Sequence, residues 1–232
     1  VIADPVTLDR LREAGTGNRQ VLVVGADPET LGDNEHDFAG LVAQASDTLD
    51  PAPTTRDDIA IWKFTTGSTG TPKACVHTAA SPIISHDSYA LGVLGIGADD
   101  IVLPVPKLFF GYARDLTALY PFGVGAAGVV FPERTTPDLI LDLIARFRPT
   151  ILVNVPTMMS AMVAHPDAAM QDLGSLRLCT SAGEALPADL HRAWDETFGV
   201  EVVDGIGSSE AYHIYISNRP GAARRGTCGQ VV

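Results

Sequence analysis

The chain has 232 residues, with 16 Lys and Arg against 28 Asp and Glu, which gives a formal net charge of −12. This acidic balance argues against general nucleic-acid binding and against an anionic membrane surface, although a local loop can still bind a nucleotide. Hydrophobic residues make up 46% of the chain and charged residues 19%, which excludes a disordered chain and predicts one large or two small domains with a buried core.

Cysteine usage and the first residues bear on location. The three cysteines, Cys75, Cys179 and Cys228, are odd in number and widely spaced, which argues against a disulfide framework and against a structural zinc site. The first residues do not resemble a signal peptide, and no apolar run reaches membrane length. We therefore expect a cytoplasmic protein that binds neither membrane nor nucleic acid.

Short β-branched runs alternate with helix-like stretches along the chain. The clearest helix begins at Thr136 and Pro137, where a capping hydroxyl precedes a proline at the first helical position, and Pro149 ends it. Because alternating strands and helices imply crossover connections, we predict an α/β fold with a mainly parallel sheet and helices on both faces. The other expected helices are 37–45, 82–94, 156–164 and 187–198, and the expected strands are 21–25, 59–64, 101–105, 129–131, 151–155, 176–179 and 200–203.

One glycine pattern matches a dinucleotide-binding motif in its letters but not in its context. Gly123, Gly125 and Gly128 have the spacing G-x-G-x-x-G, which binds a dinucleotide only between a preceding strand and a following helix. Here we expect a helix before the pattern and a strand after it. We interpret it as a Gly/Ala-rich turn that lets a helix pack closely against a strand.

A loop rich in hydroxyl side chains follows the expected strand at 59–64. Its glycines let backbone N–H groups converge on an anion, its hydroxyls donate to phosphate oxygens, and its lysine adds positive charge. The common P-loop pattern is not met, because Pro72 precedes the lysine and Ala74 follows it. A flexible linker has the same composition, but the position directly after a strand favours a phosphate site. The loop reads Thr65-Thr66-Gly67-Ser68-Thr69-Gly70-Thr71-Pro72-Lys73.

This loop resembles the signature of the adenylate-forming enzymes, which include acyl- and aryl-coenzyme A ligases, luciferases and adenylation domains. Two later segments, 181–187 and 204–210, resemble the adenine-binding motifs of that superfamily and come in the same order. Two more, 107–112 and 212–218, resemble the benzoate–coenzyme A ligase branch. The resemblance covers 57–232, the adenylate-forming core, whereas residues 1–56 are expected to be the distal part of a first α/β subdomain and a connection.

The resemblance implies roles for individual residues. Lys73, Glu210 and His213 would be catalytic, with Glu210 also the ligand of Mg²⁺. The remaining assignments are phosphate binding by Thr65, Thr66, Gly67, Ser68, Thr69, Gly70, Thr71, Lys73 and Ser209; adenine binding by Gly183, Glu184, Ala185, Asp204, Gly205, Ile206 and Gly207; and acid binding by Phe110, Gly111, Tyr112, Ala182, Gly205, His213 and Ile214. For His213 an ordinary core histidine stays an alternative, and Phe109 is expected in the core.

The sequence departs from the family pattern in three places. Ala74 and Cys75 follow the lysine where the family usually has glycine, and Ser209 replaces the usual threonine. The family's ribose-binding aspartate, hinge and C-terminal lysine domain find no counterpart in these residues. We therefore expect part of the large N-terminal domain of an adenylate-forming enzyme, with little turnover by itself.

Function follows from the resemblance, with alternatives. The first expectation is ATP-dependent activation of benzoate or a substituted benzoate to an acyl-adenylate and then a coenzyme A thioester, with ATP, Mg²⁺ and coenzyme A as the small molecules used. An aryl-acid adenylation enzyme that loads a carrier protein would need the same pocket. A non-catalytic fragment that binds nucleotide or acid is the alternative from another class. The resemblance leaves a homodimer open.

Overall fold

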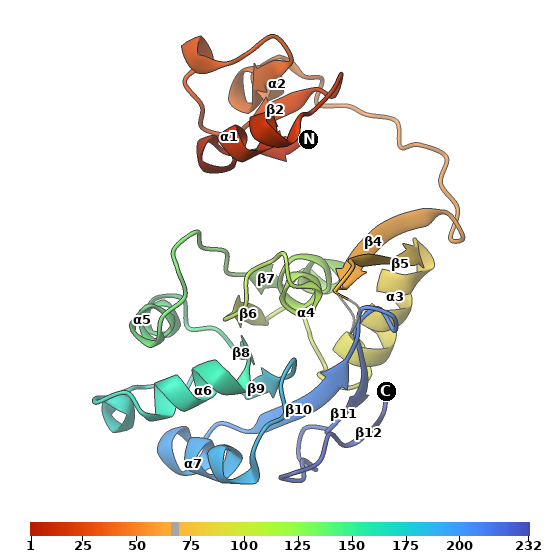
Figure 1. Cartoon of the computed structure of the whole chain (residues 1–232). Helices are drawn as coiled ribbons and strands as arrows, with labels where there is room; N and C mark the ends of the chain where they lie inside the picture. The colour runs from red at the N-terminus through yellow and green to blue at the C-terminus, as the bar shows by residue number, and fades with distance from the viewer. Residues whose placement is uncertain (66–69) are drawn as a thin grey trace. The chain divides into compact units, whose positions relative to one another are not determined.

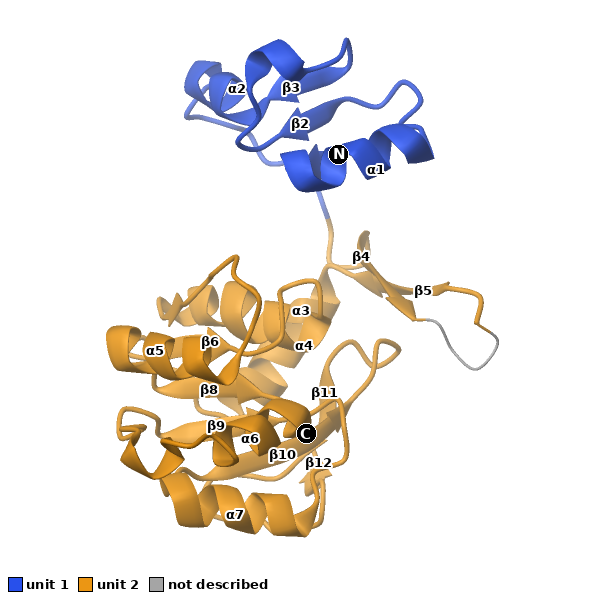
Figure 2. Ribbon diagram, turned by 60° about the vertical axis from the view of Figure 1, so that its left-hand side comes forward, with its two compact units in different colours: residues 1–54 blue, residues 55–232 orange. Residues whose placement is uncertain are grey.

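The computed structural model describes residues 1–65 and 70–232. The chain divides into two compact units, Val1–Thr54 and Thr55–Val232, which Figure 2 distinguishes by colour. Each unit has its own core, and each is described by itself below. In the described residues no helix has the length and apolar character that a bilayer crossing requires.

Unit 1 is a small three-stranded parallel sheet with helices. Its core is formed by Ala3, Leu8, Val21 and Val23. Asp4 caps the first helix, because its carboxylate accepts a hydrogen bond from the Thr7 backbone N–H at 2.8 Å. The strand order is β1-β2-β3. The elements are β1 (Ile2–Ala3), α1 (Pro5–Ala14), β2 (Val21–Val23), η1 (Pro28–Thr30), β3 (Glu35–Asp37) and α2 (Phe38–Gln44).

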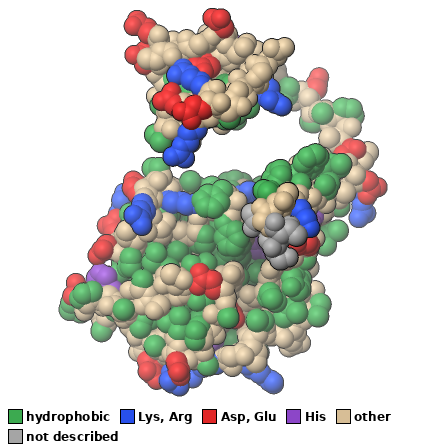
Figure 3. All heavy atoms as spheres, viewed as in Figure 1, with side chains coloured by type: hydrophobic (Ala, Val, Ile, Leu, Met, Phe, Trp, Pro, Cys, Tyr) green, Lys and Arg blue, Asp and Glu red, His purple; other side chains and the backbone are tan. Residues whose placement is uncertain are grey.

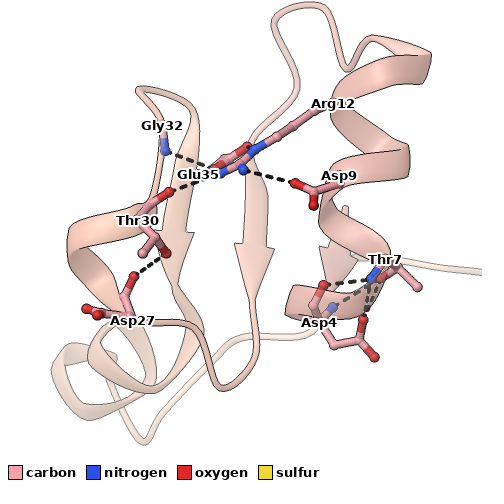
Figure 4. Close-up of polar contacts among 8 residues, drawn as sticks. All are labelled: Asp4, Thr7, Asp9, Arg12, Asp27, Thr30, Gly32 and Glu35. Atoms are coloured by element: carbon pink, nitrogen blue, oxygen red, sulfur yellow. Dashed lines mark hydrogen bonds and ion pairs between the residues drawn. The ribbon is translucent and has the colours of Figure 1, made fainter.

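A bidentate ion pair between Arg12 and Glu35 connects α1 to β3 in this unit (Figure 4). Arg12 donates from Nε to Glu35 Oε1 at 2.8 Å and from Nη2 to Oε2 at 2.6 Å. The arginine also donates to the Thr30 carbonyl at 3.1 Å, and the Gly32 N–H donates to Glu35 at 2.9 Å. The contacts from Arg12 and from the Gly32 N–H hold the pKa of Glu35 down at about 2, because both favour its ionised form.

Unit 2 is built on a seven-stranded sheet with the order β12-β11-β10-β9-β8-β6-β7. The pairs from β7 through β10 are parallel, and β11 and β12 run antiparallel at one edge. The prediction of a mainly parallel α/β fold is therefore confirmed. The strands are β6 (Ile101–Pro104), β7 (Ala127–Gly128), β8 (Ile151–Asn154), β9 (Leu178–Ser181), β10 (Val202–Gly207), β11 (Ile214–Ser217) and β12 (Gln230–Val231).

Helices cover both faces of this sheet, as expected (Figure 1). Successive strand residues point to opposite faces, so Leu152 packs in one buried cluster while Ile151 and Val153 pack in the other. The first cluster includes residues of α5, α6 and α7, and the second includes residues of η2, α4 and η3. The helices are α3 (Ala80–Ser85), η2 (His86–Leu91), α4 (Gly111–Arg114), η3 (Asp115–Leu119), η4 (Pro121–Val124), α5 (Pro137–Phe147), α6 (Pro156–Val163), η5 (Ala168–Met170) and α7 (Ala188–Phe198).

The hairpin of β4 (Ile59–Thr65) and β5 (Lys73–Thr78) stands apart from the large sheet. The two strands are antiparallel, and Thr65 pairs with Lys73 at the end next to the connecting turn. The strand expected at 59–64 is thus present, whereas β5 was not predicted. One face of the hairpin is apolar and open to solvent, with Trp62 60% and Phe64 68% exposed.

The glycine-rich segment behaves as the sequence suggested, with one correction. The helical turn η4 contains its first glycine, Gly123, and its last glycine lies in β7 rather than before a strand at 129–131. That expected strand begins two residues too late, although the Val129 N–H still donates to the Val102 carbonyl at 2.8 Å. A Cβ on Gly128 would lie 2.1 Å from the Thr117 carbonyl oxygen in η3, so only glycine fits this approach of helix and strand.

Candidate active site

A cavity of about 380 Å³ opens at the carboxyl ends of β9 and β10, where ligands bind in α/β sheets. The start of α4, the hairpin strand β4 and the loop before β11 complete its wall. Six of the seven residues expected to bind the acid line it: Phe110, Gly111, Tyr112, Ala182, His213 and Ile214. The other lining residues are Trp62, Lys63, Phe64, Phe109, Arg114, Gly183, Gly207, Ser208, Ser209 and Tyr212.

Gly205 is the expected acid-binding residue that does not reach this cavity. It lies inside β10, and a Cβ there would lie 2.9 Å from the Ile216 carbonyl oxygen on the neighbouring strand. Its glycine is explained by that close approach of β11. Phe109 was expected in the core, and this is wrong, because it is 92% exposed at the cavity rim.

His213 lies buried among three tyrosine rings. The ring centroids of Tyr89, Tyr112 and Tyr120 lie 5.4, 5.9 and 5.2 Å from that of the imidazole. Its Nε2 is 3.2 Å from the Tyr112 carbonyl oxygen, and Nδ1 has no hydrogen-bond partner among the described residues. Burial lowers the pKa of His213 to about 4, so the imidazole is neutral at pH 7. A neutral ring that donates from Nε2 keeps Nδ1 as an acceptor.

The residues expected around adenine fall into two groups. Gly183 and Gly207 line the cavity, and a Cβ on Gly207 would lie 2.6 Å from the His213 carbonyl oxygen. Glu184, Ala185, Asp204 and Ile206 do not line it. Glu184 instead caps α6, because its carboxylate accepts from the Thr157 backbone N–H at 3.2 Å and from its hydroxyl at 2.7 Å.

Asp204 is a buried carboxyl in the middle of β10. Its Oδ1 has no hydrogen-bond partner among the described residues, and it pairs in register with Ser181 on β9. Burial raises the pKa of Asp204 to about 6, against a smaller opposing effect of Ser181. A buried carboxyl oxygen without a partner can accept a hydrogen bond, but Asp204 does not line the cavity.

The expected phosphate loop, 65–73, begins at the last residue of β4 and ends at the first residue of β5. Thr66, Gly67, Ser68 and Thr69 lie outside the described residues. Thr65 ends β4, and Gly70, Thr71 and Lys73 are solvent-exposed. Ser209, the remaining residue expected to bind phosphate, lines the cavity.

His77 on β5 is a functional candidate that the sequence reasoning missed. It is 8% exposed, and its Nε2 lies 2.6 Å from the Ser209 carbonyl oxygen. Its ring meets Tyr212 edge-to-face at 5.1 Å. This histidine therefore ties the hairpin to the loop that carries Ser209 and Glu210.

Glu210 is exposed and lines an adjacent cavity of about 340 Å³ rather than the first one. The two cavities share Tyr212 and Ile214. Among the residues that the structure describes, no group of three His, Cys, Asp or Glu side chains is placed to hold a metal ion. A single exposed carboxylate suits Mg²⁺ that takes its other ligands from phosphates and water.

A charged cluster in the cavity wall was also missed. The Lys63 ammonium lies 3.1 Å from Oδ2 of the fully buried Asp115, and the Arg114 Nη2 lies 2.7 Å from its other oxygen. Lys63 also donates to the Tyr212 carbonyl and sits 3.5 Å from the centroid of the Tyr212 ring. The only sequence signal was a lysine in an otherwise apolar strand.

Comparison with known proteins places these motifs in a family. A family model described as AMP-binding enzyme matches residues 1–232. The chain is 42% identical over 201 residues to a benzoate–CoA ligase of Thauera aromatica, covering 87% of this chain and 38% of that protein. It is 38% identical over 213 residues to a 4-hydroxybenzoate–CoA/benzoate–CoA ligase of Rhodopseudomonas palustris, covering 91% of this chain and 38% of that protein.

Solved structures agree with the sequence comparison. The structure of an anthranilate CoA ligase in complex with anthranoyl-AMP superposes with a TM-score of 0.93 at 36% identity, covering all of this chain and 45% of that one. The chain therefore spans about two fifths of the length of the curated relatives it matches.

Proposed function

The chain belongs to the AMP-binding enzyme family, and from this we propose that it serves the ATP-dependent activation of an aryl carboxylic acid. The first product is an acyl-adenylate with release of pyrophosphate, and the second is a coenzyme A thioester with release of AMP. Benzoate or a substituted benzoate is the proposed acid. The names of the relatives, which are benzoate–CoA and hydroxybenzoate–CoA ligases, support this substrate class.

The cavity is the single observation that carries the proposal. Its glycines and aromatic side chains give it flat walls, which suit an aryl ring better than a flexible acyl chain. It borders the motif residues Gly183, Gly207 and Ser209, so an acid in the cavity has its carboxyl group beside the proposed nucleotide site. Proximity of the two reactants supplies much of the rate in such a transfer.

His213 is proposed to select ring substituents rather than to bind the reacting carboxylate. Because Nε2 donates to the Tyr112 carbonyl, the neutral ring offers only the Nδ1 acceptor. An acceptor attracts a hydroxyl or amino substituent and repels a carboxylate. The residue therefore favours hydroxy- and aminobenzoates.

The polyphosphate is proposed to lie at the hairpin turn and the Ser209 loop. Thr65, Lys73 and the intervening residues would bind the outer phosphates, and Glu210 would hold Mg²⁺. When bound, Mg²⁺ neutralises charge on the polyphosphate. His77 fixes the Ser209 carbonyl and so keeps this loop in place beside the hairpin.

The test is acid-dependent ATP–pyrophosphate exchange with the complete product of the gene. We expect exchange with benzoate or its hydroxy and amino derivatives, followed by thioester formation with coenzyme A. A phosphopantetheinylated carrier protein offered in place of coenzyme A separates a ligase from a carrier-loading enzyme. Absence of exchange with every aryl acid would contradict the proposal.

A matched pair of variants tests the phosphate assignment. Lys73→Ala is expected to slow adenylation about tenfold to a hundredfold, the usual effect of losing a charged phosphate contact. Arg56→Ala removes an exposed positive charge shortly before β4 and is expected to leave the rate unchanged. Equal rates for the two variants would remove Lys73 from the phosphate site.

A further inference from the structure

Two cations and one carboxylate meet at the cavity wall. The described lining residues include Lys63 and Arg114 and no acidic side chain. Asp115 lies behind them, fully buried, and shares its two oxygens between the two cations. The cluster therefore carries one net positive charge that no described residue of the wall balances.

The Lys63 side chain is held in position by burial and hydrogen bonds. Lys63 is only 8% exposed, whereas its neighbours on β4, Trp62 and Phe64, are 60% and 68% exposed. Burial lowers the pKa of its ammonium, and Asp115 opposes that effect. Burying a charge in this way is costly unless it is paired and hydrogen-bonded, as Lys63 is by Asp115.

Tyr212 adopts an unusual backbone conformation at the same place. Its φ of 74° is in the left-handed region, which non-glycine residues seldom adopt. That conformation brings both its carbonyl and its ring onto the Lys63 ammonium. Strain of this kind concentrates at ligand sites.

One N–H of Lys63 and part of Arg114 stay available to a ligand. An ammonium has three donors, and Lys63 directs two of them to Asp115 and to the Tyr212 carbonyl. Among the described residues the third has no oxygen or nitrogen acceptor, and the other group near it is the Tyr212 ring, whose centroid lies 3.5 Å from Nζ. Gly111 has no side chain to shield it, because a Cβ there would lie 3.1 Å from the Lys63 Nζ. The Arg114 side chain is 29% exposed and also lines the cavity.

We propose that the aryl acid carries a second carboxylate, and that Lys63 and Arg114 bind this second group. The inference rests on the proposed function, because it concerns the acid that the cavity takes. Benzene dicarboxylates are the simplest members of the class. The cation is unsuited to the reacting carboxylate, which loses its charge in the adenylate, since a contact stronger in the substrate than in the transition state slows the reaction. A substituent that keeps its charge throughout is bound equally in both states.

Equal binding of the second carboxylate in the substrate and in the transition state predicts which kinetic constant changes. It lowers KM for the diacid and leaves kcat almost unchanged. If Lys63 instead held the reacting carboxylate, its loss would impair benzoate and the diacids alike. The ratio between the two substrates therefore distinguishes the two roles.

The experiment compares benzoate with phthalate, isophthalate and terephthalate in pyrophosphate exchange by the complete gene product. We expect kcat/KM for at least one diacid to exceed that for benzoate. In Lys63→Met, where Arg114 and Asp115 still form a neutral pair, the diacid preference should fall about tenfold to a hundredfold through KM. Arg114→Gln leaves the Lys63–Asp115 pair and should act in the same direction. Lys63→Arg should retain the preference, and Arg192→Gln, which removes an exposed charge on α7, should have no effect.

The outcomes separate this inference from the proposed function. Preference for benzoate over all three diacids, or a ratio that both neutralising variants leave unchanged, would overturn the second-carboxylate assignment while aryl-acid activation stands. Exchange with none of the aryl acids would overturn the proposed function itself.

Discussion

Gly111 controls how closely a ligand approaches the Lys63 ammonium. A methyl group at this position would lie 3.1 Å from Nζ and 3.4 Å from Cε, so the end of the lysine side chain must move. The space that glycine leaves is therefore bordered by a cation rather than by an apolar wall.

We predict that Gly111→Ala shifts acid preference toward unsubstituted benzoate by about 1–3 kcal/mol, the usual value of a methylene in a pocket. The added methyl fills space beside the ring and displaces the ammonium that would bind a substituent. Competition between benzoate and its hydroxy, amino and carboxy derivatives measures the shift. Gly97→Ala is the control, because a Cβ there meets nothing within 4 Å. An unchanged ranking in Gly111→Ala would remove this residue from the acid site.

Asp204 makes the stability of unit 2 depend on pH. Its pKa is raised from 3.8 to about 6 in the fold. Between these values the native carboxyl keeps its proton while the unfolded one ionises, so the free energy of unfolding falls as pH rises through this window. Above about pH 6 the loss of stability caused by burying this carboxyl has reached its full value.

We predict that Asp204→Asn becomes more stable relative to wild type as pH rises from 4 to 6, by about 2–3 kcal/mol, and that the difference is then constant. Urea unfolding of the 232-residue chain at several pH values measures it. Subtracting the wild-type values removes the opposite contribution of His213, whose pKa burial lowers to about 4. Asp99→Asn changes an exposed carboxyl and should show no such trend. A difference independent of pH would contradict the buried state of Asp204.

Local motifs were predictable at the site, but the partners of those motifs were not. The glycines at 183 and 207 belong to short segments whose spacing is informative. Lys63, in contrast, meets Asp115 52 positions later and Tyr212 149 positions later, and no local pattern indicates such pairs. A single lysine in an apolar strand indicates a buried charge, but its partners can be identified only from the three-dimensional structure.

Periodicity and caps located most helices and strands. The helix α5 begins after Thr136 as its cap predicted, because the hydroxyl accepts from the Leu139 N–H at 3.3 Å. The strand expected at 176–179 is β9, two residues further on, since its bounds follow the pairing with β8 and β10 rather than local hydrophobicity. The edge strands β11 and β12 were not predicted, because their antiparallel pairing is a long-range property.

The strand β7 packs closely against η3 at Gly128, and a substitution there tests how much this packing stabilises unit 2. We predict that Gly128→Ala destabilises unit 2 by about 1–3 kcal/mol or more, because the new methyl group would lie 2.1 Å from the Thr117 carbonyl oxygen. Backbone must shift to accept it, and this breaks part of the pairing with β6. Denaturant unfolding measures the loss, with Gly97→Ala again as the control. If the two variants were equally stable, the packing of helix on strand would not depend on this glycine.

Unit 2 exposes apolar side chains around the cavity. Figure 3 shows hydrophobic side chains spread across one face of unit 2. Those of Trp62, Phe64 and Phe109 lie at the cavity rim and are each more than half exposed. A reaction that forms an adenylate requires water to be excluded from the reacting groups. The cavity that these 232 residues form is therefore open on the side where the chemistry is proposed.

The 232 residues span 38% of the length of the benzoate–CoA ligase of Thauera aromatica. We predict that this chain, produced alone, binds an aryl acid or nucleotide weakly and turns over little. Arg219, Arg224 and Arg225 are cations that follow Glu210, but Arg219 and Arg225 are engaged elsewhere, with the Gly92 carbonyl and with Asp195. Loss of one preorganised charge contact, such as the one expected from the family's C-terminal lysine, typically slows the chemical step about a hundredfold to a thousandfold. Entry of water to the reacting groups would slow adenylation further. Acid-dependent pyrophosphate exchange by the 232-residue chain is compared with that of the same chain joined to the C-terminal portion of the Thauera aromatica enzyme. Comparable rates would show that these residues are sufficient for adenylation.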